Sequence, residues 1–381
     1  MRFGVRVVLR GSVVFAAMAA TAFCAGCVHR PAQGVLTPTT QQVEGNARVP
    51  ILVATTRKKA VEDPGSMFGG ERADTLSYAA ITVSIPPDRK VGHVQWPTSL
   101  PGDAKRDFVT VSADYIDQRA FAAQIAETAR RTKQPRVLIF VHGFNNRFDD
   151  SVYRFAQIVH DSKAEAVPVL FTWPSRGNVQ LKSYTYDRES ANYSRDALEG
   201  LIDQIASYPH IKEVHLLAHS MGSHVTLEAL RGRSMRRAPG GDKVKQAMLV
   251  APDIDVDVFR ATLKRMGPNR PKMLLFASRD DGALALSKNI WGGVDRIGEV
   301  GASEPYRTEF EQQKIAVYDL TPLQSKGSSA HSRAFDDIGD VMELVRQRNM
   351  QERGIQPATQ VARGAPPAAA PSPTETAALR D

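Results

Sequence analysis

A serine in a sharp turn is the first feature of this sequence that could do chemistry. The stretch HLLAHSMGSHVTLEAL (residues 215–230) starts as an apolar strand and continues with the apolar spacing of a helix. Ser220 stands between the two, close to the small residues Ala218 and Gly222. A strand–turn–helix with the pattern G-x-S-x-G exposes a serine hydroxyl, and here alanine takes the place of the first glycine. Ser220 is therefore a candidate nucleophile, and the alternative is a serine that only caps a helix.

A serine nucleophile needs a histidine base that a carboxylate orients, in the chain order Ser, Asp or Glu, His. His331 lies in the loop SKGSSAHSRAF, between the last predicted strand and the last predicted helix. Asp280 lies two residues after the strand MLLFAS and is the favoured acid, because Asp281 is expected to open the next helix. Asp253 and Asp255 follow the preceding strand and remain alternatives.

The same chemistry needs backbone N–H groups that stabilise the oxyanion of a tetrahedral intermediate. The segment FVHGFNNRF places the His142-Gly143 turn at the end of a predicted strand, and glycine permits an unusual backbone angle there. The N–H of Phe144 is the expected first donor. That of Met221, directly after the serine, is the expected second. The alternative is that His142-Gly143 is only a tight turn.

Alternating strands and helices must position these residues. The pattern predicts a mostly parallel central sheet with helices on both faces, an α/β fold. A glycine-bearing loop is predicted over residues 62–74 and a long helix over 189–208. The predicted strands cover residues 49–58, 78–86, 108–115, 136–141, 167–173, 213–219, 246–251, 272–278 and 314–320.

The N-terminus has the features of a bacterial export signal with a lipid-attachment site. Residues 1–26 combine three arginines, an apolar segment and small residues before Cys27, so we expect a signal peptide and lipidation of Cys27. Residues 27–46 are predicted to be a flexible tether, 47–350 the folded domain, and 351–381 a disordered Pro/Ala-rich tail. Because Val28 replaces the aspartate that favours inner-membrane retention, the expected location is the outer membrane, facing the periplasm.

Composition limits the other classes of function. The net charge of +8 includes three arginines of the predicted signal, and the remaining mild excess lacks the dense basic blocks expected of a nucleic-acid binder. Cys24 and Cys27 are the only cysteines in the sequence, so a thiolate metal site is excluded from the predicted domain. No metal-ligand spacing or glycine-rich nucleotide loop occurs, and no metal or cofactor is expected.

Several segments together resemble a bacterial α/β-hydrolase family of unknown function whose members are often described as esterase/lipase-like. They are VLIFVHGFNNRFDDSVYRFAQIVHD, PVLFTWPSRG, YDRESANYSRDAL, LLAHSMGSH, ASRDDGAL and AHSRAF, and VATTRK near the N-terminus. The resemblance spans about residues 49–348. It implies an α/β-hydrolase fold and a serine hydrolase with the triad Ser220, Asp280 and His331. The segments 173–177 and 186–189 are expected either to shape the rim of the pocket or to be structural.

The favoured function is hydrolysis of a carboxylic ester, a small-molecule or lipid substrate, through an acyl-enzyme intermediate. Thioesterases, amidases and acyltransferases use the same residues, so the motifs do not choose between them. The alternative from another class is a non-catalytic lipoprotein that uses the scaffold for binding. A serine-directed fluorophosphonate probe distinguishes the two, because a binding protein should not react with it.

Overall fold

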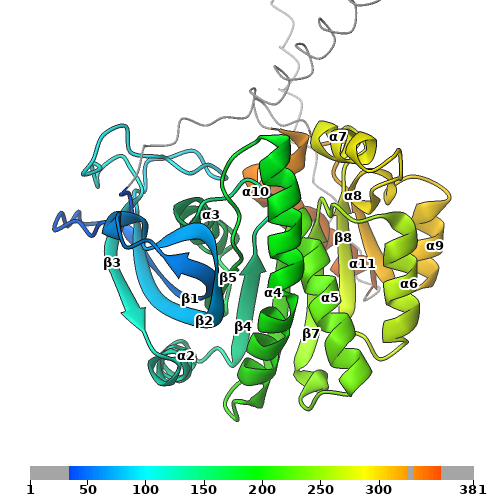
Figure 1. Cartoon of the computed structure of the whole chain (residues 1–381), viewed down its shortest axis with the longest axis horizontal. Helices are drawn as coiled ribbons and strands as arrows, with labels where there is room; N and C mark the ends of the chain where they lie inside the picture. The colour runs from blue at the N-terminus through cyan, green and yellow to red at the C-terminus, as the bar shows by residue number, and fades with distance from the viewer. Residues whose placement is uncertain (1–33, 324–328, 353–381) are drawn as a thin grey trace, which may run out of the picture. The chain divides into compact units, whose positions relative to one another are not determined.

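A nine-stranded sheet runs through the part of the chain that the computed structural model describes, residues 34–323 and 329–352 (Figure 1). The strands are β1 Ala47–Lys59, β2 Phe68–Ile85, β3 Val109–Ile116, β4 Arg136–Val141, β5 Val167–Thr172, β6 Glu213–His219, β7 Val244–Val250, β8 Lys272–Ala277 and β9 Ile315–Asp319. They lie in the order β3-β2-β1-β5-β4-β6-β7-β8-β9. The pairs β1–β2 and β2–β3 are antiparallel and the pairs from β1–β5 to β8–β9 are parallel, which confirms the predicted mostly parallel sheet.

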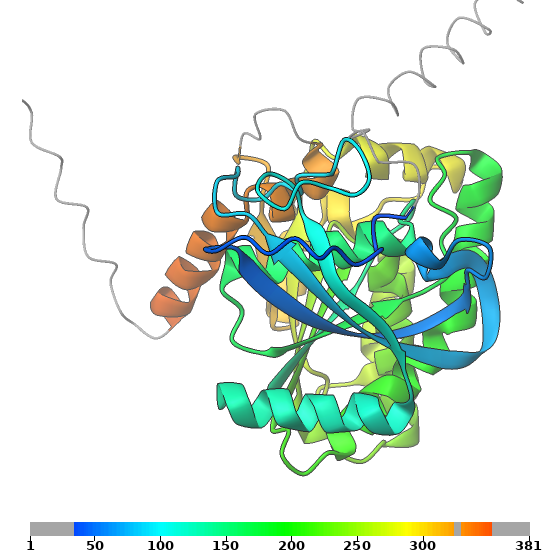
Figure 2. The same cartoon turned by 90° about the vertical axis from the view of Figure 1, so that its left-hand side faces the viewer.

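Helices cover both faces of this sheet. The helices are α2 Gln118–Thr132, α3 Phe148–Ser162, α4 Leu181–Ser207, α5 Met221–Arg236, α6 Val256–Met266, α7 Gly282–Ile290, α8 Ile297–Val300, α9 Tyr306–Gln312, α10 Arg333–Asp336 and α11 Ile338–Glu352. In Figure 1, α4, α5 and α6 lie side by side across the near face, and α3 lies behind the sheet. Figure 2 shows the antiparallel edge, with α2 below the strands. The chain divides into two units, Met1–Met342 with the whole sheet, and Glu343–Asp381, of which the end of α11 is described.

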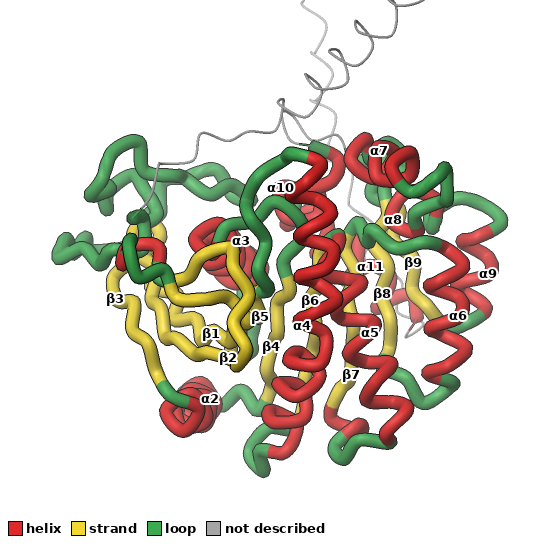
Figure 3. Tube along the Cα trace, viewed as in Figure 1, coloured by secondary structure: helices red, strands yellow, loops and turns green. Residues whose placement is uncertain are grey.

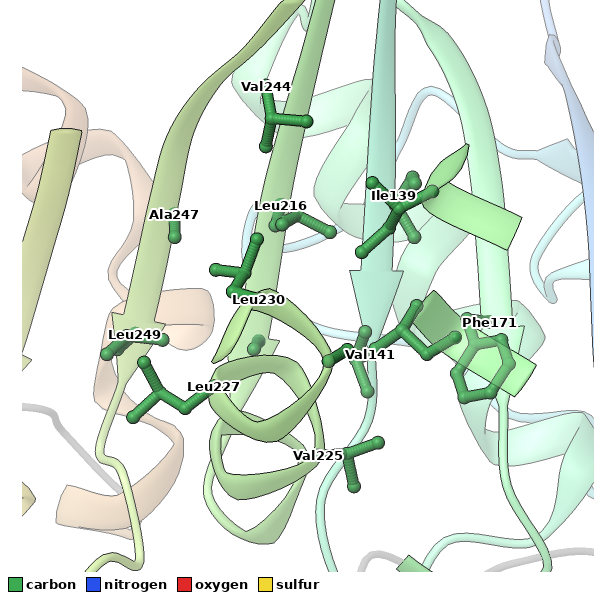
Figure 4. Close-up of a cluster of buried hydrophobic side chains, with 14 of the residues drawn as sticks. Ile139, Val141, Phe171, Leu216, Val225, Leu227, Leu230, Val244, Ala247 and Leu249 are labelled. Atoms are coloured by element: carbon green, nitrogen blue, oxygen red, sulfur yellow. The ribbon is translucent and has the colours of Figure 1, made fainter. Parts of the chain in front are cut away.

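The core forms where α5 packs on the middle of the sheet. Figure 4 shows Val225, Leu227 and Leu230 of α5 beside Leu216 of β6 and Leu249 of β7. All five side chains are buried. Each fully buried aliphatic side chain of this size contributes about 1.5–3 kcal/mol. The apolar runs of the central strands therefore hold the sheet between its helices and fix the ends of β6 and β7.

Two predicted elements have other bounds in the structure. The loop predicted over residues 62–74 is wrong from Phe68 onward, because β2 starts there and pairs with the end of β1. The long helix α4 starts at Leu181, before the predicted residue 189. Its additional first turns bury Tyr184 and Asp187, a tertiary effect that the helical pattern alone did not predict.

The structure describes residues 34–46 of the predicted flexible tether, and the start of this segment packs against the domain. Val35 and Leu36 are buried. The N–H of Leu36 donates to the carbonyl of Gly65 at 3.0 Å, and the Tyr153 hydroxyl donates to the carbonyl of Val35 at 2.9 Å. These contacts hold Val35 and Leu36 against the domain. Residues 1–33, with the signal and Cys27, and 353–381 lie outside the described residues.

The parallel strands bring the predicted site residues to one end of the sheet. Ser220 follows β6, His142 and Phe144 follow β4, Asp280 and its neighbour Asp281 follow β8, and His331 follows β9. Figure 3 shows α7 and α10 together at this end. Ligands of α/β sheets bind at the carboxyl ends of the strands.

Candidate active site

Ser220 occupies a strained turn between β6 and α5. Its backbone has φ 51° and ψ −123°, an angle pair that residues other than glycine rarely adopt. The turn is fixed on both sides, since the Ser220 N–H donates to the Val250 carbonyl at 2.9 Å and its carbonyl accepts from Ser223 N–H at 3.0 Å. The sequence pattern around Ser220 thus folds into the predicted strand–turn–helix.

Two glycines allow the chain to approach Ser220 closely. A Cβ atom on Gly222 would lie 2.6 Å from the Val141 carbonyl oxygen, and one on Gly143 would lie 2.9 Å from the Cβ of Ser220. Side chains at either position would collide with the backbone at the end of β4 or with the serine itself. The glycines therefore bring the turn after β4 into contact with the serine.

His331 and Asp281 form a pair beside this turn, in which Asp281 is buried and His331 is partly exposed. Nδ1 of His331 donates to Oδ2 of Asp281 at 2.8 Å, which leaves Nε2 of His331 as the free acceptor. Burial by itself lowers the pKa of His331, but the Asp281 carboxylate outweighs it and raises this pKa above its usual value. Burial likewise would raise the pKa of Asp281, but the charge of His331 and its hydrogen bond hold that pKa below its usual value.

The structure places Asp281, and not the predicted Asp280, against His331. Asp280 is half exposed and forms a salt bridge with Arg333, with Nη2 2.7 Å from Oδ2. The sequence argument set Asp281 aside because it should cap α7, and it does cap α7. Its Oδ1 accepts the N–H groups of Ala283 and Leu284 at 3.1 Å. A carboxylate has two oxygens, so Oδ2 remains available for His331.

The two alternative acids, Asp253 and Asp255, form hydrogen bonds with groups other than His331. Asp253 accepts the hydroxyls of Tyr184 at 2.8 Å and Ser287 at 2.6 Å, and Asp255 caps α6. Neither has a hydrogen bond to His331 within the part of the chain that the structure describes. The candidate residues that fit both the chain order Ser, Asp, His and the observed contacts are therefore Ser220, Asp281 and His331.

His219 is a site residue whose role the sequence analysis missed. Its Nε2 donates to the backbone carbonyl of His331 at 2.9 Å, and the two rings lie 4.7 Å apart. Burial, followed by the charge of His331, lowers the pKa of His219 to about 3, so its ring is neutral and can hold this carbonyl. It lies directly before the serine in the chain, and no sequence signal predicted its contact across 112 residues.

The predicted oxyanion donors flank the serine. Phe144 follows the glycine that contacts Ser220, and Met221 is the first residue of α5. Among the described residues, neither backbone N–H donates a hydrogen bond. Both groups are therefore available to an oxygen atom held beside Ser220.

Comparison with known protein families identifies the family of this chain. Residues 117–348 match the family described as "Alpha/beta hydrolase of unknown function (DUF900)". The chain belongs to this family. The match confirms the expected α/β-hydrolase fold, and it begins after β1, β2 and β3. None of the curated proteins matches the chain.

The solved structures that match the chain include several esterases. Esterase B from Lactobacillus rhamnosis has 11% identity and a TM-score of 0.31, with 63% of this chain and 99% of that chain covered. An esterase from Rhizomucor miehei has 10% identity and a TM-score of 0.32, with 93% and 94% covered. An esterase from Pyrococcus furiosus has 13% identity and a TM-score of 0.29, with 58% and 84% covered.

The candidate site opens into a cavity of about 770 Å³. Ser220, His331 and Phe144 line it together. One wall is apolar and comes mainly from α7, with Leu284, Leu286 and Ile290. Cavities of about 300–1,000 Å³ with mostly apolar walls are typical of small-molecule sites.

The segments 173–177 and 186–189 are mostly structural in this chain. The Ser175 hydroxyl donates to the buried Asp187 carboxylate at 2.5 Å, and the N–H of Arg176 donates to the same group at 2.9 Å. Of these nine residues, Gly177 lines the cavity. Among the described residues, no group of three or more His, Cys, Asp or Glu side chains could hold a metal ion.

Proposed function

We propose that the chain is a serine hydrolase that cleaves carboxylic esters, with Ser220 as nucleophile, His331 as base and Asp281 as the orienting acid. The observation that carries the proposal is the 2.8 Å hydrogen bond from His331 Nδ1 to Asp281 Oδ2, in a cavity that Ser220 shares. The strained backbone of Ser220 supports it independently, because such strain concentrates at functional sites.

Each residue has one task in the proposed reaction. Ser220 Oγ attacks the ester carbonyl while Nε2 of His331 takes its proton, and Asp281 stabilises the imidazolium that forms. The N–H groups of Phe144 and Met221 bind the oxyanion. His331 then returns the proton to the departing alkoxide, which leaves as the alcohol, and the acyl group stays on Ser220. Water, activated by His331, releases the acid in the second half.

The cavity favours esters with an apolar acyl or alcohol part. The wall formed by Leu284, Leu286 and Ile290 can bury alkyl groups, and each CH₂ removed from water contributes about 0.8 kcal/mol. We therefore expect kcat/KM for p-nitrophenyl esters to rise from the acetate toward medium-length chains. Rates that fell steadily with chain length would contradict the apolar assignment of this wall.

A fluorophosphonate probe tests the proposed nucleophile. The purified chain should react covalently with the probe, and peptide mass spectrometry should find the adduct on Ser220. Labelling should be lost on heat denaturation, because the reaction needs the folded base and oxyanion donors. An adduct on another serine, or none on the folded protein, would contradict the proposal and favour a binding protein.

We also propose that Cys27, outside the described residues, carries a lipid that anchors the chain to a membrane. The support is the basic and apolar sequence before Cys27. None of the helices in the described part of the chain is both long and apolar enough to cross a membrane. The outer membrane, with the domain in the periplasm, is the proposed location.

Expression in a bacterial host tests the anchor. The intact mass of the mature N-terminus should include attached lipid, and the protein should sediment with membranes. Cys27→Ser should prevent lipid attachment but leave fluorophosphonate labelling of the folded domain unchanged. An unmodified N-terminus on a soluble wild-type protein would exclude the anchor.

A further inference from the structure

A buried arginine, Arg57 of β1, lies beneath the turn that carries the oxyanion donor Phe144. Its side chain is 1% exposed. Nη1 donates to the Ser175 carbonyl at 2.9 Å, and Nη2 donates to the Asn146 carbonyl at 2.8 Å. Nε donates to the Thr172 hydroxyl at 2.5 Å. One guanidinium therefore joins the loop after β5 to the loop after β4.

Asn146 extends this connection to the oxyanion turn. Its side-chain Nδ2 donates to the carbonyls of Phe144 at 2.8 Å and Gly143 at 3.2 Å. Its backbone N–H donates to the Ser175 hydroxyl at 3.1 Å. Asn146 is thus fixed on its backbone by Arg57 and Ser175 and holds the turn with its side chain.

His142 also forms a hydrogen bond to the Gly143 carbonyl. Its Nε2 accepts the N–H of Trp173 at 3.2 Å and lies 3.4 Å from Nη2 of Arg57. Nε2 is therefore the acceptor of a neutral ring, and the proton on Nδ1 donates to the Gly143 carbonyl at 2.8 Å. Burial, followed by the charge of Arg57, holds the pKa of His142 well below its usual value, which keeps the ring neutral.

Because of the geometry of the peptide bond, these contacts also orient the N–H of Phe144. The Gly143 carbonyl and the Phe144 N–H belong to one planar trans peptide and point in opposite directions. Fixing the carbonyl therefore fixes the N–H. We propose that Arg57 is a positioning residue that, through Asn146 and His142, holds the Phe144 N–H in the direction of the oxyanion. This inference rests on the proposed hydrolase function.

Through Arg57, the N-terminal strand β1 contacts the loops that form the candidate site. β1 lies before residues 117–348, which match the family. The buried carboxylate of Asp187 accepts a hydrogen bond from Ser175, whose carbonyl Arg57 also contacts. Asp187 is therefore a negative charge near the buried guanidinium of Arg57. Burial lowers the pKa of Arg57 to about 10, and the guanidinium stays charged at neutral pH.

Arg57→Lys and Asn146→Ala test the proposal on p-nitrophenyl ester turnover. Lysine keeps the charge but lacks the planar fork that bonds several carbonyls at once. Loss of an oxyanion donor costs about 10²–10³ in kcat, so a loosened donor should cost roughly 10- to 100-fold. KM should change little, because the interaction forms in the transition state. The inhibition constant of a trifluoromethyl ketone, which forms an oxyanion on the serine, should rise in proportion.

Arg72→Lys is the matched control. Arg72 lies on the neighbouring strand β2, is half-buried, and donates to the Ser190 hydroxyl at 3.0 Å and the Tyr186 carbonyl at 3.2 Å. It contacts α4 but not the oxyanion turn. Its substitution should lower thermal stability without changing kcat beyond about twofold, because surface and half-buried changes away from a site act mainly on stability.

A double-mutant cycle decides between a positioning role and general stabilisation. Because both residues act on one turn, Arg57→Lys and Asn146→Ala together should cost less kcat than the product of the single losses. The inference would be overturned if the kcat losses of the two single variants multiplied in the double variant. It would also be overturned if Arg57→Lys and Asn146→Ala folded and had the same kcat as Arg72→Lys. If Arg57→Lys does not fold, Asn146→Ala alone must lower kcat at constant KM. A wild type without turnover or labelling would instead refute the proposed function, and the inference with it.

Discussion

Ser220→Ala is expected to lower kcat for ester hydrolysis by about 10⁶-fold, the loss typical of removing a serine nucleophile. The change removes one oxygen atom from a buried side chain, and Ser220 Oγ has no hydrogen bond within the described residues. The folded structure should therefore persist. Steady-state turnover of a p-nitrophenyl ester and thermal unfolding measure the two effects on the same sample. Retained turnover in a contaminant-free sample would contradict the mechanism.

Ser220→Gly is the matched variant for this test. It should be equally inactive, but more stable than Ser220→Ala. Glycine adopts positive φ freely, whereas alanine at φ 51° keeps the strain of the turn. Strain of this kind amounts to roughly 1–3 kcal/mol. Equal unfolding temperatures for the two variants would show that the turn stores little strain.

Asp281→Asn should lower kcat by roughly 10⁴-fold. An asparagine can still cap α7 through its Oδ1, so stability should change little. Its amide would face Nδ1 of His331 as a donor, which favours the tautomer with the proton on Nε2. In this form His331 cannot accept the proton of Ser220. Turnover and thermal unfolding of the purified variant give the two measurements.

The pH profile of the same variant reports on His331 directly. Protonated His331 is not a base, so kcat/KM should fall as the pH drops through its pKa. The carboxylate of Asp281 raises that pKa, and the acidic limb of the wild type should lie above the ordinary value of 6.5. Asp281→Asn removes this charge and should shift the limb to lower pH.

Asp280→Asn is the control for the acid. It breaks the half-exposed salt bridge to Arg333, which is worth about 1 kcal/mol or less. Its pH limb should stay where the wild type has it, and its kcat should fall less than tenfold, because Asp280 does not contact His331. If Asp280→Asn were the more damaging change, the proposed acid would be wrong.

Much of the fold followed from local patterns in the sequence. Apolar runs such as residues 136–141 and 213–219 predicted buried strands, and the helical spacing between them predicted a parallel sheet, which the structure contains. Where a segment was polar, local patterns predicted less of its packing. Residues 34–46 look like a linker, yet Val35 and Leu36 are buried, because their partners lie in distant parts of the chain.

By itself the sequence determined the candidate serine, the candidate base and the order of the elements that carry them. Ser220 and His331 stand next to turn and loop residues whose local pattern is distinctive. Only the tertiary structure decided between Asp280 and Asp281, which are neighbours in the chain. A one-residue step turns a side chain in a different direction, and His331 meets Asp281 across 50 residues. Arg57 also needed the fold, because its contacts with Ser175 and Asn146 cross 118 and 89 residues, and local sequence cannot encode which distant carbonyls a buried guanidinium will join.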